Sequence, residues 1–101
     1  MKISAHLLNS ENKLETILKT NDHVNSLIIP TKESGYGSKI NGGELLFLAL
    51  AICYCNDLNR EASKKGINVT SVDVIVEGNF DSEGEPAQNV SYRAKVSAQT
   101  S

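Results

Sequence analysis

The sequence predicts one α+β domain over residues 1–101, in which an antiparallel sheet of an N-terminal meander and a C-terminal hairpin surrounds one long buried helix. Three observations predict this class. Short runs of strand-forming residues alternate with turn residues at the start of the chain, a long apolar segment with helix signals at both ends follows, and two segments of alternating apolar and polar residues come last. The length fits a single domain.

The first thirty residues contain three short strand candidates, Ile3–Leu8, Lys13–Lys19 and Val24–Ile29. The polar residues 9–12 and 20–22 separate them, and such residues are typical of turns. Pro30 ends the third candidate, because proline lacks the amide proton that a strand uses. The simplest arrangement is a meander.

A helix is predicted from about Gly42 to Lys65, and both of its ends are marked. Asn41 can cap the first turn, and Glu44, three residues later, can complete a capping box. Gly66 follows the last turn and can take the left-handed conformation that commonly ends helices. The helix bounds are therefore well specified.

The first half of this helix is apolar on every side, whereas the second half is amphipathic. A helix buried all round in so small a domain needs cover from more than one direction. A sheet on one side and a second subunit on the other would provide it, so we expect a homodimer. The apolar run, residues 45–55, is too short to cross a bilayer, which takes roughly 20 residues.

After Gly66, two strands are predicted at Val69–Gly78 and Asn89–Ser97, with the polar residues 81–86 between them. Apolar and polar residues alternate along both strands, so one face of each is expected to lie in the core. The two strands should pair as a hairpin.

The charge pattern excludes several partners. Ten basic and twelve acidic residues give a net charge of -2 and form no long run, so no nucleic acid is expected. The N-terminus lacks the apolar core of a signal peptide, and no membrane association is expected, which predicts a cytoplasmic protein. Both cysteines lie in the apolar run and should be reduced thiols.

Neither a metal nor a cofactor is expected. His6 and His23 with Asp22 lack a third ligand at a recognisable spacing. The acidic residues in 81–85 lack the spacing of a calcium loop and fit a solvated hairpin tip.

Residues 43–55, GELLFLALAICYC, resemble the central helix motif of the OsmC-like and organic hydroperoxide resistance (Ohr) family. Residues 56–67 and the strand at 72–77 are similar to a short OsmC-like branch, and the resemblance covers roughly residues 40–96. It implies an intertwined homodimer with two central helices wrapped by antiparallel sheets. It also implies a role in oxidative stress, as a thiol-dependent peroxidase that acts on organic hydroperoxides.

By this resemblance Cys53 is the thiol that attacks the peroxide. We also expect Glu44 to help position it, and Cys55 is a candidate secondary thiol. Three features depart from the family pattern. The family's second cysteine lies far toward the C-terminus, in a part that this chain is expected to lack. Its active-site arginine comes from the N-terminal strands, whereas the arginines here are Arg60 and Arg93, and its catalytic glutamate aligns with Gly43.

Helix geometry constrains the chemistry around Cys53. Two residues apart on a helix, Cys53 and Cys55 point to nearly opposite sides, so no disulfide is expected between them. Arg60 shares the face of Cys53, but Asp57, at three residues' spacing, is its nearer partner.

Two hypotheses remain open. In the first, Cys53 reduces organic hydroperoxides and an external thiol completes the cycle. In the second, a catalytically degenerate homodimer binds a small apolar or electrophilic ligand without turnover. The retained Cys53 favours the first, and the departures from the family pattern favour the second.

Overall fold

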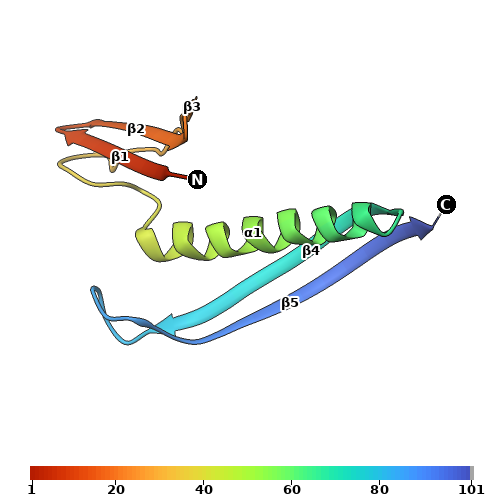
Figure 1. Cartoon of the computed structure of the whole chain (residues 1–101). Coiled ribbons are helices and arrows are strands. Elements are labelled where there is room, and N and C mark those ends of the chain that lie inside the picture. Colours follow the sequence, from red (N-terminus) through yellow and green to blue (C-terminus); the bar gives the residue numbers. More distant parts are fainter. Residues whose placement is uncertain (101) are drawn as a thin grey trace. The chain divides into compact units, whose positions relative to one another are not determined.

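The computed structural model describes residues 1–100 and has the predicted α+β composition, with one helix and two antiparallel sheets (Figure 1). The chain divides into two compact units, which we call unit 1 (Met1–Asn41) and unit 2 (from Gly42 onward). The meander and the hairpin form separate sheets, one in each unit.

Unit 1 is the predicted meander. Its strands are β1 (Ile3–Ser10), β2 (Lys13–Thr20) and β3 (His23–Asn25), which pair antiparallel in the order β1-β2-β3. Asn12 and Asn21, in the two turns, have φ angles of 57° and 52°. Asparagine tolerates this left-handed conformation better than most residues, which explains its place in both turns.

The third strand is shorter than predicted, since β3 ends at Asn25 and the candidate extended to Ile29. A side chain explains the difference. The hydroxyl of Thr16 donates a hydrogen bond to the carbonyl oxygen of Leu27 at 2.7 Å and accepts one from its amide at 3.1 Å. The backbone of Leu27 is thus bonded to a side chain and leaves the ladder.

A polar segment, residues 31–39, lies between β3 and α1 and is hydrogen-bonded to the turn between β1 and β2. The amide of Gly37 donates to the side-chain oxygen of Asn9 at 2.9 Å, and the amide of Asn12 donates to the carbonyl of Gly35 at 3.3 Å. Gly35 and Gly37 have φ angles of 82° and 99°, which glycine adopts without strain. These bonds give the segment a defined path.

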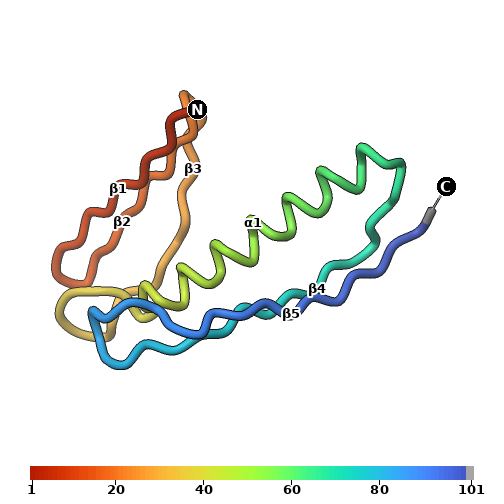
Figure 2. Tube along the Cα trace, turned by 60° about the horizontal axis from the view of Figure 1, so that its bottom comes forward, coloured from red at the N-terminus to blue at the C-terminus, as the bar shows by residue number. Residues whose placement is uncertain are grey.

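Unit 2 consists of α1 (Gly42–Lys64), β4 (Ile67–Phe80) and β5 (Ala87–Thr100). Gly66 has a φ of 70° and its amide bonds to the carbonyl of Ser63 at 3.1 Å, so the predicted end of the helix is confirmed. The predicted hairpin is also confirmed, and both of its strands run further than predicted. Figure 2 shows α1 running along the hairpin.

The hairpin has one apolar face and one polar face. Val72 lies opposite Val96, and Val76 lies opposite Tyr92, so their side chains share the face that we call the inner face. The outer face carries the residues between them, which are mostly charged residues and serine. There, Arg93 and Glu77 form an ion pair at 2.8 Å, with both side chains more than half exposed.

Helix α1 packs on the inner face of the hairpin, along β4. Phe47 stacks on Phe80 with ring centroids 5.8 Å apart, and Tyr54 contacts Tyr92 at 6.1 Å. Gly78 makes the close approach possible, because a Cβ atom at this position would lie 2.8 Å from the ring of Phe47.

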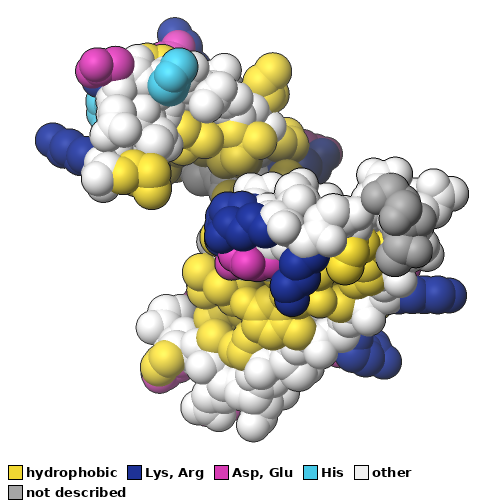
Figure 3. All heavy atoms as spheres, turned by 45° about the vertical axis from the view of Figure 1, so that its right-hand side comes forward, with side chains coloured by type: hydrophobic (Ala, Val, Ile, Leu, Met, Phe, Trp, Pro, Cys, Tyr) yellow, Lys and Arg dark blue, Asp and Glu magenta, His cyan; other side chains and the backbone are white. Residues whose placement is uncertain are grey.

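Within unit 2, the other side of α1 is uncovered. Among the described residues of the chain, Ala62 alone is buried, at 8% exposure, whereas Leu46, Leu48 and Ile52 are about half exposed. Figure 3 shows hydrophobic side chains gathered over unit 2. The burial on all sides that was predicted for this helix is not reached within unit 2, because the hairpin covers only one side.

Candidate functional site

The uncovered face of α1, which we define by Leu46, Leu48, Ile52 and Cys53, carries the exposed thiol of the chain. At about 100° per residue, Cys53 lies close to the line of Leu46, and this line lies about 100° around the helix from the row of Phe47 and Tyr54 that contacts the hairpin. The sequence places a thiol on an apolar surface that nothing in its own unit covers.

The two cysteines have different surroundings, and both are free. Cys53 is exposed, whereas Cys55 is half buried. The amide group of Asn59 donates to the carbonyl oxygen of Cys55 at 2.9 Å and lies 3.5 Å from its sulfur. Cys55 is therefore engaged within the helix, and Cys53 is the accessible thiol.

The nearest cation to Cys53 along its own face is already paired. Arg60 Nη2 lies 2.6 Å from Asp57 Oδ1, which confirms the pairing predicted from their spacing, and Arg60 Nε lies 4.0 Å from Glu61. Within residues 1–100, no hydrogen bond or ion pair reaches the sulfur of Cys53. The thiol of Cys53 therefore lies one helical turn from the carboxylate of Asp57, which the guanidinium of Arg60 neutralises.

Glu44 is not brought to Cys53 within the chain. It lies in the first turn of α1, nine residues before Cys53, which at 1.5 Å per residue separates the two by about 14 Å along the helix axis. The proposed positioning role of Glu44 therefore stays a prediction, and it needs an arrangement other than a contact along one helix.

The histidines of unit 1 form no cluster with other ligands. Within residues 1–100, no group of three or more His, Cys, Asp or Glu side chains is arranged to hold a metal ion. In the same range no helix has both the length and the apolar character required to span a bilayer.

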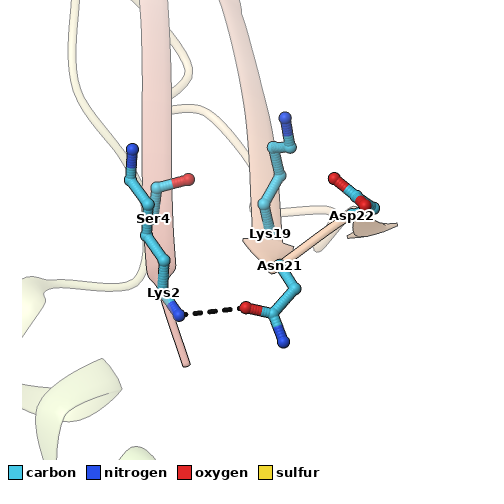
Figure 4. Close-up of a pocket in the computed structure, with 5 residues that line it drawn as sticks. All are labelled: Lys2, Ser4, Lys19, Asn21 and Asp22. Carbon is cyan, nitrogen blue, oxygen red and sulfur yellow. Dashed lines mark hydrogen bonds between the residues drawn. The ribbon is translucent and has the colours of Figure 1, made fainter.

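Unit 1 has a shallow hollow of about 450 Å³ that the sequence reading did not single out. Figure 4 shows it at the base of the β1–β2 hairpin, where the backbone amide of Lys2 bonds to the side chain of Asn21 at 3.1 Å. Lys2, Ser4, Lys19, Asn21 and Asp22 line it. All five are exposed. Lys2 and Ser4 are two residues apart, as are Lys19 and Asn21, and this spacing is the signal that could have revealed the hollow. It contains no thiol.

A family comparison identifies the fold around the cysteines. The family model described as OsmC-like protein matches residues 35–101, about two-thirds of the chain. This chain belongs to the OsmC-like protein family. The matched part of this OsmC-like protein contains all of α1 and the hairpin, and hence Cys53 and the Asp57–Arg60 pair. The comparisons with curated proteins and with solved structures gave no match.

Proposed function

We propose that this OsmC-like stress-response protein reduces organic hydroperoxides, with Cys53 as the attacking thiol and an external thiol as the reductant. One observation carries the proposal. In the helix that the family model matches, Cys53 is the exposed cysteine, and it lies on an apolar face beside Leu46 and Ile52. Apolar surroundings favour a hydroperoxide with a hydrocarbon substituent over a fully polar one.

The proposed reaction has two stages. The thiolate of Cys53 attacks the terminal oxygen of the hydroperoxide, an S–O bond forms as the O–O bond breaks, and the alcohol leaves with a proton from solvent. Cys53 becomes a sulfenic acid. An external thiol then displaces water to form a mixed disulfide, and a second thiol releases Cys53 as the new disulfide leaves.

An external reductant follows from the arrangement of the two thiols. Two residues on a helix span about 200°, and the sulfur of Cys55 lies 3.5 Å from the side-chain nitrogen of Asn59. Within one chain, Cys55 cannot reach Cys53 without unwinding of α1. A small dithiol can reach Cys53 from solvent.

The proposed active form is a homodimer in the cytoplasm. The uncovered face of α1 and the inner face of β5 both carry exposed apolar side chains, and Tyr92 and Val96 of β5 are 45% and 40% exposed. A second copy fits this surface best, because a two-fold axis would cover the same apolar patch on both chains at once. Burial of this patch would supply the core that the single chain lacks.

In this dimer Glu44 has a path to a Cys53 site that it lacks within one chain. We propose that Glu44 positions the thiol or substrate across the interface, from the other copy of the helix. The distance of about 14 Å along a single helix is the reason for assigning it to the partner.

The test is the consumption of cumene hydroperoxide in the presence of a dithiol. The wild type and Cys55→Ser should turn over, and Cys53→Ser, which changes a single exposed atom, should lose the activity. Equal rates for the wild type and Cys53→Ser would overturn the proposal. Cys55→Ser serves as the matched control, because it removes a thiol from the same helix.

A second candidate function is the binding of a small apolar or electrophilic ligand without turnover. The ion pair between Asp57 and Arg60 at 2.6 Å favours this function. Because Arg60 is bound to Asp57, its charge is not directed at a thiolate of Cys53. In this case the hydroperoxide would be left intact, and an apolar ligand would stabilise the wild type against heat by an amount that rises with the logarithm of its concentration above the dissociation constant.

A further inference from the structure

We propose that the Asp57–Arg60 ion pair sets the reactivity of Cys53, with Arg60 as a positioning residue that neutralises Asp57. The inference deepens the proposed function, because it rests on Cys53 being the attacking thiol. It assigns a role to an arginine that the helix itself supplies.

The three residues lie on one side of α1. Asp57 follows Cys53 by four residues and Arg60 follows it by seven, so both lie within about 40° of Cys53 around the helix axis. Side chains four residues apart have Cβ atoms about 5–6 Å apart. The carboxylate of Asp57 therefore lies about one turn from the sulfur, and the guanidinium of Arg60 is held 2.6 Å from that carboxylate.

Charge explains the role. An attacking cysteine must be a thiolate, and a carboxylate one turn away opposes a second negative charge. Arg60 bound to Asp57 brings the local charge close to zero and removes most of this repulsion. Glu61 also lies near, with 4.0 Å to Arg60 Nε, but Lys64 pairs with it at 3.2 Å.

The size of the effect follows from exposure. The side chains of Arg60 and Asp57 are 59% and 63% exposed, so solvent screens the interaction. At a separation of about 7 Å in such a setting, one charge changes the rate of a thiolate reaction by about two- to fourfold. This range is small but measurable with paired reagents.

The experiment measures the alkylation of Cys53 in the full chain by peptide mass spectrometry, at one fixed pH and low salt. Neutral iodoacetamide reports the supply of thiolate, and anionic iodoacetate also reports the local charge. Arg60→Gln should slow iodoacetamide about two- to fourfold and iodoacetate more strongly. Asp57→Asn should raise the iodoacetate rate relative to iodoacetamide, and Arg60→Lys should restore the wild-type ratio.

Lys64→Gln is the matched control, because it breaks another i,i+3 pair of the same helix further from Cys53. If Arg60→Gln and Lys64→Gln give the same rates with both reagents, the inference is overturned. Alkylation involves no peroxide. An ordered alkylation series without hydroperoxide turnover would therefore support this inference and defeat the proposed function separately.

Discussion

The two sides of α1 differ in what covers them, although the sequence makes both apolar. On the hairpin side, Phe47 stacks on Phe80, and Gly78 leaves no room for a Cβ atom. On the other side, Leu46 and Ile52 remain about half exposed beside Cys53. The covered side has close packing that stabilises unit 2, and the uncovered side carries the thiol to which we assign the proposed reaction.

The largest effect is expected on the uncovered side. Ile52→Lys places a charge at the centre of the proposed dimer surface, where burial is costly, and should weaken dimerisation by about a hundredfold. Sedimentation or size-exclusion chromatography over a concentration series measures this. Ile75→Lys is the control, because Ile75 is similarly exposed but lies on the charged outer face of the hairpin. Equal dimerisation of the two variants would contradict the uncovered face of α1 as the dimer surface.

The covered side should respond in stability instead. Gly78→Ala places a Cβ atom 2.8 Å from the ring of Phe47, and the ring must shift, so the free energy of unfolding should fall by about 1–2 kcal/mol. Denaturant titration gives this value. Gly42→Ala is the control, because a Cβ atom there meets nothing within 4 Å. Unchanged stability in Gly78→Ala would mean that the helix does not pack this closely.

The outer face of the hairpin should respond least. Glu77→Gln removes the ion pair with Arg93, whose side chains are 59% and 74% exposed, and should change the free energy of unfolding by less than about 1 kcal/mol. The same denaturant titration checks it. A larger loss would indicate that a partner covers the outer face of the hairpin, not its inner face.

Much of the fold could be predicted from local signals. Gly66 ended the helix as expected, because only a left-handed residue closes it there, and the alternation of residues 72–76 predicted an apolar face on β4. The spacing of Asp57 and Arg60 also predicted their pairing. Each of these features depends on residues within a turn or a strand of one another.

Other features depended on contacts that the sequence does not display. The third strand was predicted too long, because the hydroxyl of Thr16 captures Leu27 from eleven residues away. A helix apolar on all sides gives no sign of which side the hairpin will cover, so the exposure of Cys53 and the partial burial of Cys55 came only from the structure. The separation of Glu44 from Cys53 could have been read from helix geometry alone.

The most direct test of Cys53 as the attacking thiol is its oxidation by a stoichiometric amount of cumene hydroperoxide, followed by peptide mass spectrometry without reductant. The sulfenic acid can be trapped as a dimedone adduct. We expect the adduct on Cys53 in the wild type and in Cys55→Ser, and we expect it to form at a rate well above that of free cysteine. Oxidation that falls on Cys55, or that is no faster than that of free cysteine, would contradict it.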